Sequence, residues 1–142
     1  MTAVYEKHGL RFMYPENWKL TDGQEVDLPY QVTVETPAGG IWSVNIFPED
    51  VSTDELLEEA IAGLHETYDD VELSETTSDF EGFVTKGVEA FFYCLDFVVT
   101  AKIQVIETPK YKLVFLFQAE NRDFDTQHEV FRAIATSLLQ SL

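Results

Sequence analysis

The segment from Tyr111 to Ala119 places the strictest limit on the fold, because it is apolar at odd and even positions alike. In an extended strand, Leu113 and Phe115 lie on one face, while Val114 and Leu116 lie on the other. A strand buried on both sides lies in the middle of a sheet and needs a covering layer on each face. The segment therefore predicts a three-layer fold with the sheet in the centre.

Two segments have the period of amphipathic helices and can supply the outer layers. The first runs from about Thr53 to Tyr68, with Ser52 or Thr53 as N-cap. Its apolar residues, which fall within about 140° of arc, are Leu56, Leu57, Ala60, Ile61, Leu64 and Tyr68. The second helix is expected to begin at a cap formed by Asp123 or Asp125. Its apolar face consists of Val130, Phe131, Ile134, Ala135, Leu138 and Leu139.

Alternating apolar residues predict further strands earlier in the chain. One runs from Leu10 to Tyr14 and ends at Pro15, which lacks a backbone donor. Another contains Val32 and Val34, and a third covers 41–47. The glycine-containing turn at 37–40 favours a hairpin between these last two strands.

The segment 88–106 is too long for one straight strand. It is apolar at every odd position from Phe91 to Val105. Fully extended, it would span roughly 60 Å, against a diameter of roughly 40 Å for a domain of this size. A two-residue turn would exchange the inward parity, so the pattern favours a coiled strand or an odd-length turn within 96–100. We expect further turns at 79–82 and at Gly87.

These elements predict an α+β fold. The expected architecture is an α/β/α sandwich in which a mostly antiparallel sheet of about six strands carries a helix on each face. The 142 residues suit a single domain covering 1–142. The even-numbered positions from Phe92 to Ile106 form a mixed polar and apolar face, for which we favour cover by a helix over a dimer seam.

The net charge restricts the possible partners. The chain has 9 Lys and Arg residues against 26 Asp and Glu residues, giving a formal charge of −17. This balance argues against binding nucleic acid or an anionic membrane surface as the main activity. No apolar run is long enough for a membrane span, and the first residues do not resemble a secretory signal, so we expect a cytoplasmic protein.

The sequence contains no recognisable catalytic motif. His8, His65 and His128 have no second ligand or nucleophile at a spacing that would bring the groups together. Cys94 lies in an aromatic run without a basic neighbour to lower its pKa, which is typical of a buried structural cysteine. We therefore predict no enzymatic activity, no cofactor and no metal site.

Acidic residues are the main candidates for partner binding. Glu55, Glu58, Glu59 and Glu66 cluster on the outer side of the first helix, without a lysine at i+4 to neutralise them. Such an acidic ridge is either a solvated surface or a contact for a basic partner. A weaker alternative is a cation site at Asp69, Asp70 and Glu72, although that run lacks the ligand spacing of a calcium loop.

Three short motifs resemble those of one protein superfamily. They are Gly-Leu-x-Phe-x-Tyr-Pro-x-x-Trp at 9–18, Gly-Val-x-Ala at 87–90, and Phe-x-x-Ile-x-x-Ser-Leu at 131–138. Together with the order of elements, they resemble the PsbP and DcrB-like superfamily, which also includes Mog-type Ran-binding proteins and the Eag chaperones. The resemblance covers nearly the whole chain. It implies an α/β/α sandwich without catalytic residues that serves as an accessory or interaction module.

Two functional hypotheses follow from the residues and the resemblance. The leading one is a non-catalytic accessory or protein-interaction domain whose partner is basic or exposes an apolar segment. The alternative is a chaperone-like domain that shelters a partner's hydrophobic segment in an apolar groove. A homodimer is compatible with either hypothesis.

Overall fold

The computed structural model describes residues 1–76, 80, 82–83 and 85–142. The element bounds, in chain order, are β1 Thr2–Lys7, β2 Leu10–Pro15, β3 Lys19–Asp22, β4 Tyr30–Glu35, β5 Ile41–Pro48, α1 Thr53–Thr67, β6 Glu72–Thr76, β7 Thr85–Cys94, β8 Phe97–Glu107, β9 Tyr111–Glu120 and α2 Asn121–Gln140. The central-strand prediction is confirmed, since β9 lies in the middle of the sheet and is buried on both faces.

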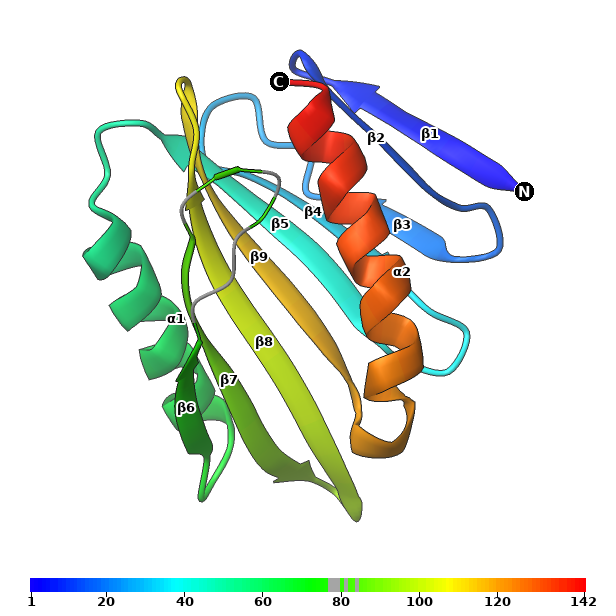
Figure 1. Cartoon of the computed structure of the whole chain (residues 1–142), viewed down its shortest axis with the longest axis vertical. Helices are drawn as coiled ribbons and strands as arrows, with labels where there is room; N and C mark the ends of the chain where they lie inside the picture. The colour runs from blue at the N-terminus through cyan, green and yellow to red at the C-terminus, as the bar shows by residue number, and fades with distance from the viewer. Residues whose placement is uncertain (77–79, 81, 84) are drawn as a thin grey trace.

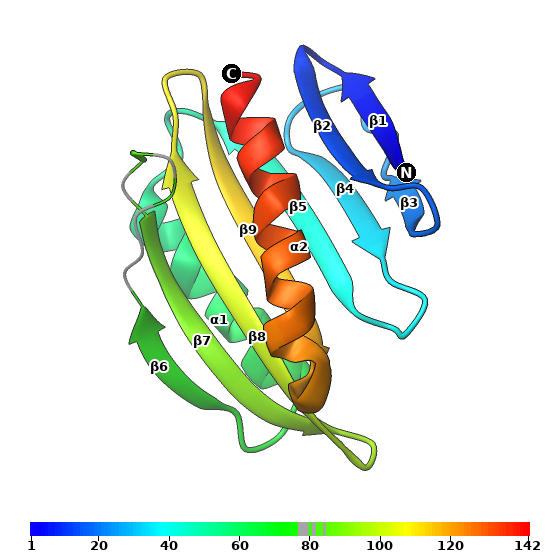
Figure 2. The same ribbon diagram turned by 45° about the vertical axis from the view of Figure 1, so that its right-hand side comes forward.

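The main sheet has the order β3-β4-β5-β9-β8-β7-β6 within the described part of the chain, and all neighbours are antiparallel. Helix α2 packs on one face and helix α1 on the other (Figures 1 and 2). The α+β sandwich is therefore confirmed, with seven strands in the sheet where about six were expected. The hairpin expected at 37–40 is also present, because β4 pairs with β5 on either side of it.

The sheet separates two apolar clusters. On the face that α2 covers, Trp42, Phe115 and Phe117 pack against Phe131 of the helix. On the face that α1 covers, the helix residues Leu56, Leu57 and Leu64 pack against β7, β8 and β9. Antiparallel pairing explains the division, because directly paired residues carry their side chains on the same face.

The first two strands form a separate two-stranded sheet beside α2, which the sequence pattern did not predict (Figure 2). The backbone N–H of Met13 donates to the hydroxyl of Ser137 at 3.0 Å, and the Trp18 ring meets Phe131 edge-on at 5.8 Å. Residues of the first and last sequence motifs therefore pack against each other. This contact ties the N-terminal hairpin to the terminal helix.

The prediction for 88–106 was wrong about the turn. Cys94 pairs with Phe97, so β7 and β8 are joined by the two-residue turn Leu95-Asp96. The inward parity does exchange there, as such a turn requires. Even positions of β7 and odd positions of β8, including Phe92 and Val99, face α1. The odd residue Tyr93 instead becomes 68% exposed.

Two other expectations need correction, and a third falls partly on residues that the structure does not describe. Gly87 lies inside β7 and not in a turn. The residue must be glycine because the neighbouring strand comes so close that a Cβ would collide with the backbone oxygen of Ile103. The turn at 79–82 lies partly outside the described residues. Helix α2 begins at Asn121, directly after β9, and the side chain of its N-cap Glu120 makes no capping hydrogen bond but pairs with Arg122 at 3.0 Å. Asp123 therefore lies in the first turn, where its negative charge interacts favourably with the positive end of the helix dipole, but it does not cap the helix.

The predicted mixed face divides between the two layers. Thr100, Gln104 and Ile106 are buried on the α2 side of the sheet, whereas Phe92 is buried on the α1 side. Val98, near the turn, is 38% exposed. Cover by a helix is therefore confirmed for the inner part of this face and is wrong for its outer end.

Candidate binding surface

The four predicted binding residues lie on the outer side of α1, and all are exposed. At about 100° per residue, Glu55, Glu59 and Glu66 fall within about 40° of one another, and Glu58 lies about 60° to one side. The structure thus brings the acidic ridge, defined by these four glutamates, to one surface.

One cation lies close to this ridge, and the sequence pattern did not reveal it. Lys86 of β7 forms an ion pair with Asp54 in the first turn of α1. The hydrogen bond and charge of Asp54 raise the pKa of Lys86, with smaller contributions from Glu75 and Glu58. Because Lys86 binds at the helix start beside Glu58, it leaves Glu59 and Glu66 without a paired cation among the described residues. A contact between a strand and a helix cannot be inferred from spacing within the helix alone.

The start of α1 is held by two polar contacts. The Ser52 hydroxyl accepts a hydrogen bond from the Glu55 N–H at 3.4 Å, which confirms the predicted cap. The buried Lys112 ammonium of β9 donates to the backbone oxygens of Glu49 at 2.5 Å and Val51 at 2.8 Å. These bonds satisfy a buried charge with carbonyl oxygens and attach the loop before α1 to the central strand. The position of the helix over the sheet is thereby fixed.

A groove runs between α1 and the half of its sheet face that the helix does not cover. Helix α1 packs on β7, β8 and β9, and beside it a cavity lies over the same face of β4 and β5. The resulting cavity has a volume of about 360 Å³. Its floor is mixed: Gln31, Ser43, Asn45 and Gln118 offer hydrogen-bond donors and acceptors, and Ile103, Val114 and Leu116 add apolar surface.

The helix wall of this groove contains Gly63 in the middle of α1. Glycine inside a helix is less favourable than alanine by roughly 0.5–1 kcal/mol. A Cβ on Gly63 would meet no atom within 4 Å, so packing does not explain the glycine. Glu59 and Glu66 lie four residues before it and three after it, on the adjoining helix surface. The groove rim is therefore open and acidic.

The three acidic residues of the alternative cation site are not arranged as a group of metal ligands in the described part of the chain. Asp69, Asp70 and Glu72 are exposed. Among the residues that the structure describes, no three acidic, histidine or cysteine side chains are grouped to hold a metal ion. The carboxylates of this loop and of the first residue of β6 are exposed to solvent. Water hydrates each of them separately, which reduces the repulsion between them.

The histidines lie in three unrelated environments. His65 is exposed on α1, and His8 stacks on Tyr30 with ring centroids 3.8 Å apart. His128 packs against Phe117 and Phe124. Its burial lowers the pKa, and the nearby charges of Lys102 and Arg132 lower it further. Each histidine thus has a packing or surface position, and within the described part of the chain none is hydrogen bonded to a carboxylate.

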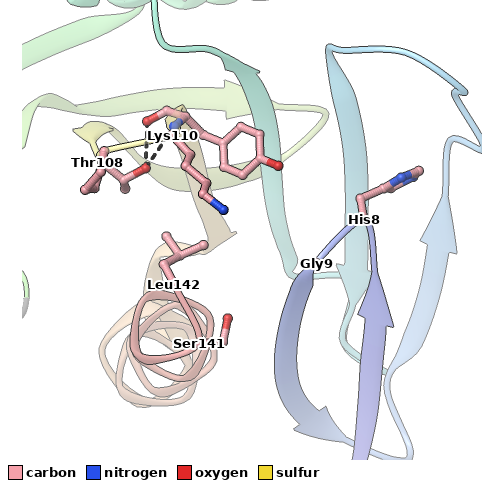
Figure 3. Close-up of a pocket in the computed structure, with 8 residues that line it drawn as sticks. His8, Gly9, Thr108, Lys110, Ser141 and Leu142 are labelled. Carbon is pink, nitrogen blue, oxygen red and sulfur yellow. Dashed lines mark hydrogen bonds between the residues drawn. The ribbon is translucent and has the colours of Figure 1, made fainter.

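A second cavity lies where the β1–β2 turn, the β8–β9 turn and the end of α2 meet (Figure 3). Its volume is about 220 Å³. The Thr108 hydroxyl donates to the backbone oxygen of Tyr111 at 2.8 Å and accepts from the Tyr111 backbone N–H at 3.1 Å, so these bonds close the β8–β9 turn. The His8 ring points away from Thr108 towards the neighbouring strands (Figure 3). The lining residues therefore bring no acid, base and nucleophile together.

Neither helix combines the length and apolar character needed to cross a bilayer, within the part of the chain that is described.

Comparison with known proteins finds similarity only at the level of structure. No family model matches this chain. No curated protein matches its sequence either.

Several solved structures share the fold. Cyanobacterial PsbP (CyanoP) from Synechocystis sp. PCC 6803 is 18% identical, with a TM-score of 0.67 over 96% of this chain and 90% of that chain. PA94 from Pseudomonas aeruginosa, a protein of unknown function described as a putative regulator, is 10% identical, with a TM-score of 0.55 over 96% and 95%. LpqN of Mycobacterium tuberculosis, described as involved in cell envelope biogenesis, is 14% identical, with a TM-score of 0.52 over 94% and 87%. These likenesses confirm the PsbP-like fold predicted from the sequence motifs.

Proposed function

We propose that this chain, which has the fold of cyanobacterial PsbP, is a non-catalytic interaction domain that binds a basic, extended segment of a partner protein. The segment lies in the groove between α1 and the open part of the sheet. Its lysine or arginine side chains meet Glu59 and Glu66 at the rim, and its backbone meets the amide and hydroxyl groups of the floor. Cytoplasmic location and homodimerisation stay predictions.

The observation that carries this proposal is the groove beside α1, whose helix wall at Gly63 has open space next to Glu59 and Glu66. The separation of the histidines supports a binding role over catalysis, because general acid–base chemistry needs groups within hydrogen-bond reach of one another. The groove lining is mixed, because Ile103, Val114 and Leu116 accompany its polar side chains. A wholly hydrophobic segment would leave Gln31, Asn45 and Gln118 without partners, so we favour a segment that presents both polar and apolar groups.

The test uses two labelled nonapeptides, one alternating lysine with serine and one alternating glutamate with serine. Fluorescence anisotropy measures their binding at about 50 mM and about 300 mM NaCl, where screening differs. We expect the lysine peptide to bind and the glutamate peptide not to bind. The double variant Glu59→Gln/Glu66→Gln weakens lysine-peptide binding roughly fivefold at low salt, as two exposed ion pairs allow.

Two further variants separate the groove from general electrostatics. Glu6→Gln/Glu16→Gln removes the same charge from exposed positions elsewhere and serves as the matched control. Gly63→Trp fills the groove from a position with open space, and Gly63→Ala leaves it nearly empty. We expect Gly63→Trp to abolish binding and Gly63→Ala to retain it. Equal weakening by both double variants, or full binding by Gly63→Trp, would show that the groove is not the site.

A further inference from the structure

The hairpin of β7 and β8 projects from the end of the sheet that lies away from the β8–β9 turn (Figures 1 and 2). Pairing between β8 and β9 begins at Val99 with Glu120, and pairing between β6 and β7 ends at Glu72 with Phe91. The strands from Tyr93 to Val98 therefore extend beyond both neighbours. This segment, 93–98, is called the hairpin tip below.

The hairpin tip is apolar and exposed. Leu95 is 90% exposed and Tyr93 is 68% exposed. Phe97 and Val98 are 48% and 38% exposed. A sheet end that had no partner would normally carry polar residues at such positions, because large contiguous apolar patches are uncommon on free surfaces. Four exposed apolar side chains within six residues therefore point to a contact surface.

Leu95 also has a backbone conformation that its side chain disfavours. Its φ is +57°, in the left-handed region. Two-residue hairpins place glycine, asparagine or aspartate at central positions with positive φ, because a bulky side chain is strained there. A leucine held in that conformation and almost fully exposed contributes little to the fold. Strain of this kind is typical of residues retained for binding.

Acidic residues surround the tip. Asp96 forms the second residue of the turn, and Glu72 lies at the adjoining edge opposite Phe91. The end of α1 is close as well, because Tyr68 stacks on Phe92 at 4.0 Å and is followed by Asp69. This charge disfavours insertion into an anionic membrane, and it disfavours the same tip of a second copy. It favours a partner with basic residues around its contact site.

A shallow hollow of about 230 Å³ lies beside the tip. Leu95, Phe97 and Cys94 form one side of it, and the β4–β5 turn at Ala38 and Gly39 forms another. The hollow gives a partner's side chain a place next to the projecting leucine. Projection and recess together form an interlocking surface, which is the usual shape of the well-packed centre of an interface.

We propose that the hairpin tip is a docking element that inserts Leu95, with Tyr93 and Phe97, into an apolar recess of a partner protein bordered by lysine or arginine. The hollow beside the tip adjoins the groove beside α1, because Gln118 lines both, but Tyr93 and Leu95 do not line that groove. The tip is smaller than a standard interface, which buries about 800 Å² on each partner. It therefore acts as the anchor of a larger contact or supports a transient one.

The test selects disulfide-constrained peptides displayed on phage against the native protein. Binding of the selected peptides is then measured for Tyr93→Ser/Leu95→Gly and for Val26→Ser. Val26 is 84% exposed in a different region, so its variant is the matched control for loss of an exposed apolar side chain. We expect the selected peptides to be rich in apolar residues and in lysine or arginine. Compared with the native protein, the tip variant should bind them at least tenfold more weakly, and the control variant should bind them equally well.

Thermal melting confirms that the tip variant is folded, and its binding of the lysine nonapeptide shows that the groove is intact. Failure to select any tip-dependent peptide overturns the proposal. Tip-dependent binding to phosphatidylcholine vesicles would assign the tip to a lipid surface and overturn it in favour of that role. A tip-dependent dimer in sedimentation velocity would assign it to a second copy, with the same consequence.

Discussion

Replacing Leu95 by glycine is expected to stabilise the fold slightly while removing the apolar tip. A left-handed backbone costs an L-residue roughly 1–2 kcal/mol, and this strain is released in the variant. Against this gain, the greater freedom of glycine in the unfolded chain lowers the free energy of unfolding by roughly 0.5–1 kcal/mol. Only a tenth of the Leu95 side chain is buried, so its lost packing amounts to about 0.2 kcal/mol. The net expectation is a gain of about 0.5 kcal/mol in the free energy of unfolding.

Urea unfolding followed by tryptophan fluorescence measures this change, because Trp42 is fully buried and reports loss of the core. Leu95→Ala provides the comparison, since it removes the same side chain and keeps the strained backbone. We expect the glycine variant to be more stable than the alanine variant by about 0.5–1 kcal/mol, at an unchanged denaturant slope. The opposite order, or a loss above about 1 kcal/mol in Leu95→Gly, would refute the argument that Leu95 is strained and dispensable for folding.

Two further predictions concern the sheet and its margin. Gly87→Ala is expected to destabilise the protein by about 1–3 kcal/mol in urea unfolding, because the new Cβ meets the backbone of Ile103 and Gln104, which no rotamer change can move. A loss below about 1 kcal/mol would contradict the close approach. Asp22 accepts hydrogen bonds from the Gln24 N–H at 2.8 Å and from Lys7 at 3.1 Å, and these contacts, the backbone bond first, lower its pKa against the opposing effect of burial. Its ionised form therefore stabilises the fold above the ordinary pKa of 3.8, and this stabilisation is lost as the pH falls through the lower pKa of the folded state. Asp22→Asn should be less stable than the native protein at pH 7, with a difference that narrows below pH 3.8; a difference that stays constant with pH would contradict the argument.

Local patterns predicted the candidate ridge but not the groove beside it. The positions of Glu55, Glu59 and Glu66 follow from helical periodicity alone. The groove depends on where α1 stops covering the sheet, and its floor brings together Gln31, Asn45 and Gln118 from three strands. Nothing in the local sequence of any one strand indicates that these side chains are neighbours. Gly63 is visible in the sequence as a helix-interior glycine, which is a signal that could have marked the rim.

The hairpin tip shows the same division between pattern and structure. The odd-numbered apolar pattern of 91–105 correctly predicted strands, but it suggested the wrong parity across the turn. A two-residue turn exchanges the faces, and pairing with β9 decides which residues of β8 are covered. Tyr93 and Phe97 thus belong to an apolar run in sequence and to an exposed surface in the fold.

The amino-acid sequence by itself determined the local elements, namely the doubly apolar strand β9, both amphipathic helices and the three-layer class. Each depends on a side-chain period within one segment, which does not require knowledge of other segments. Only the tertiary structure decided the strand order, the separate β1–β2 sheet, the open part of the sheet beside α1 and the exposed hairpin tip. These features depend on which segments pair and how far each helix extends over the sheet, and such long-range contacts leave no periodic signal along the chain.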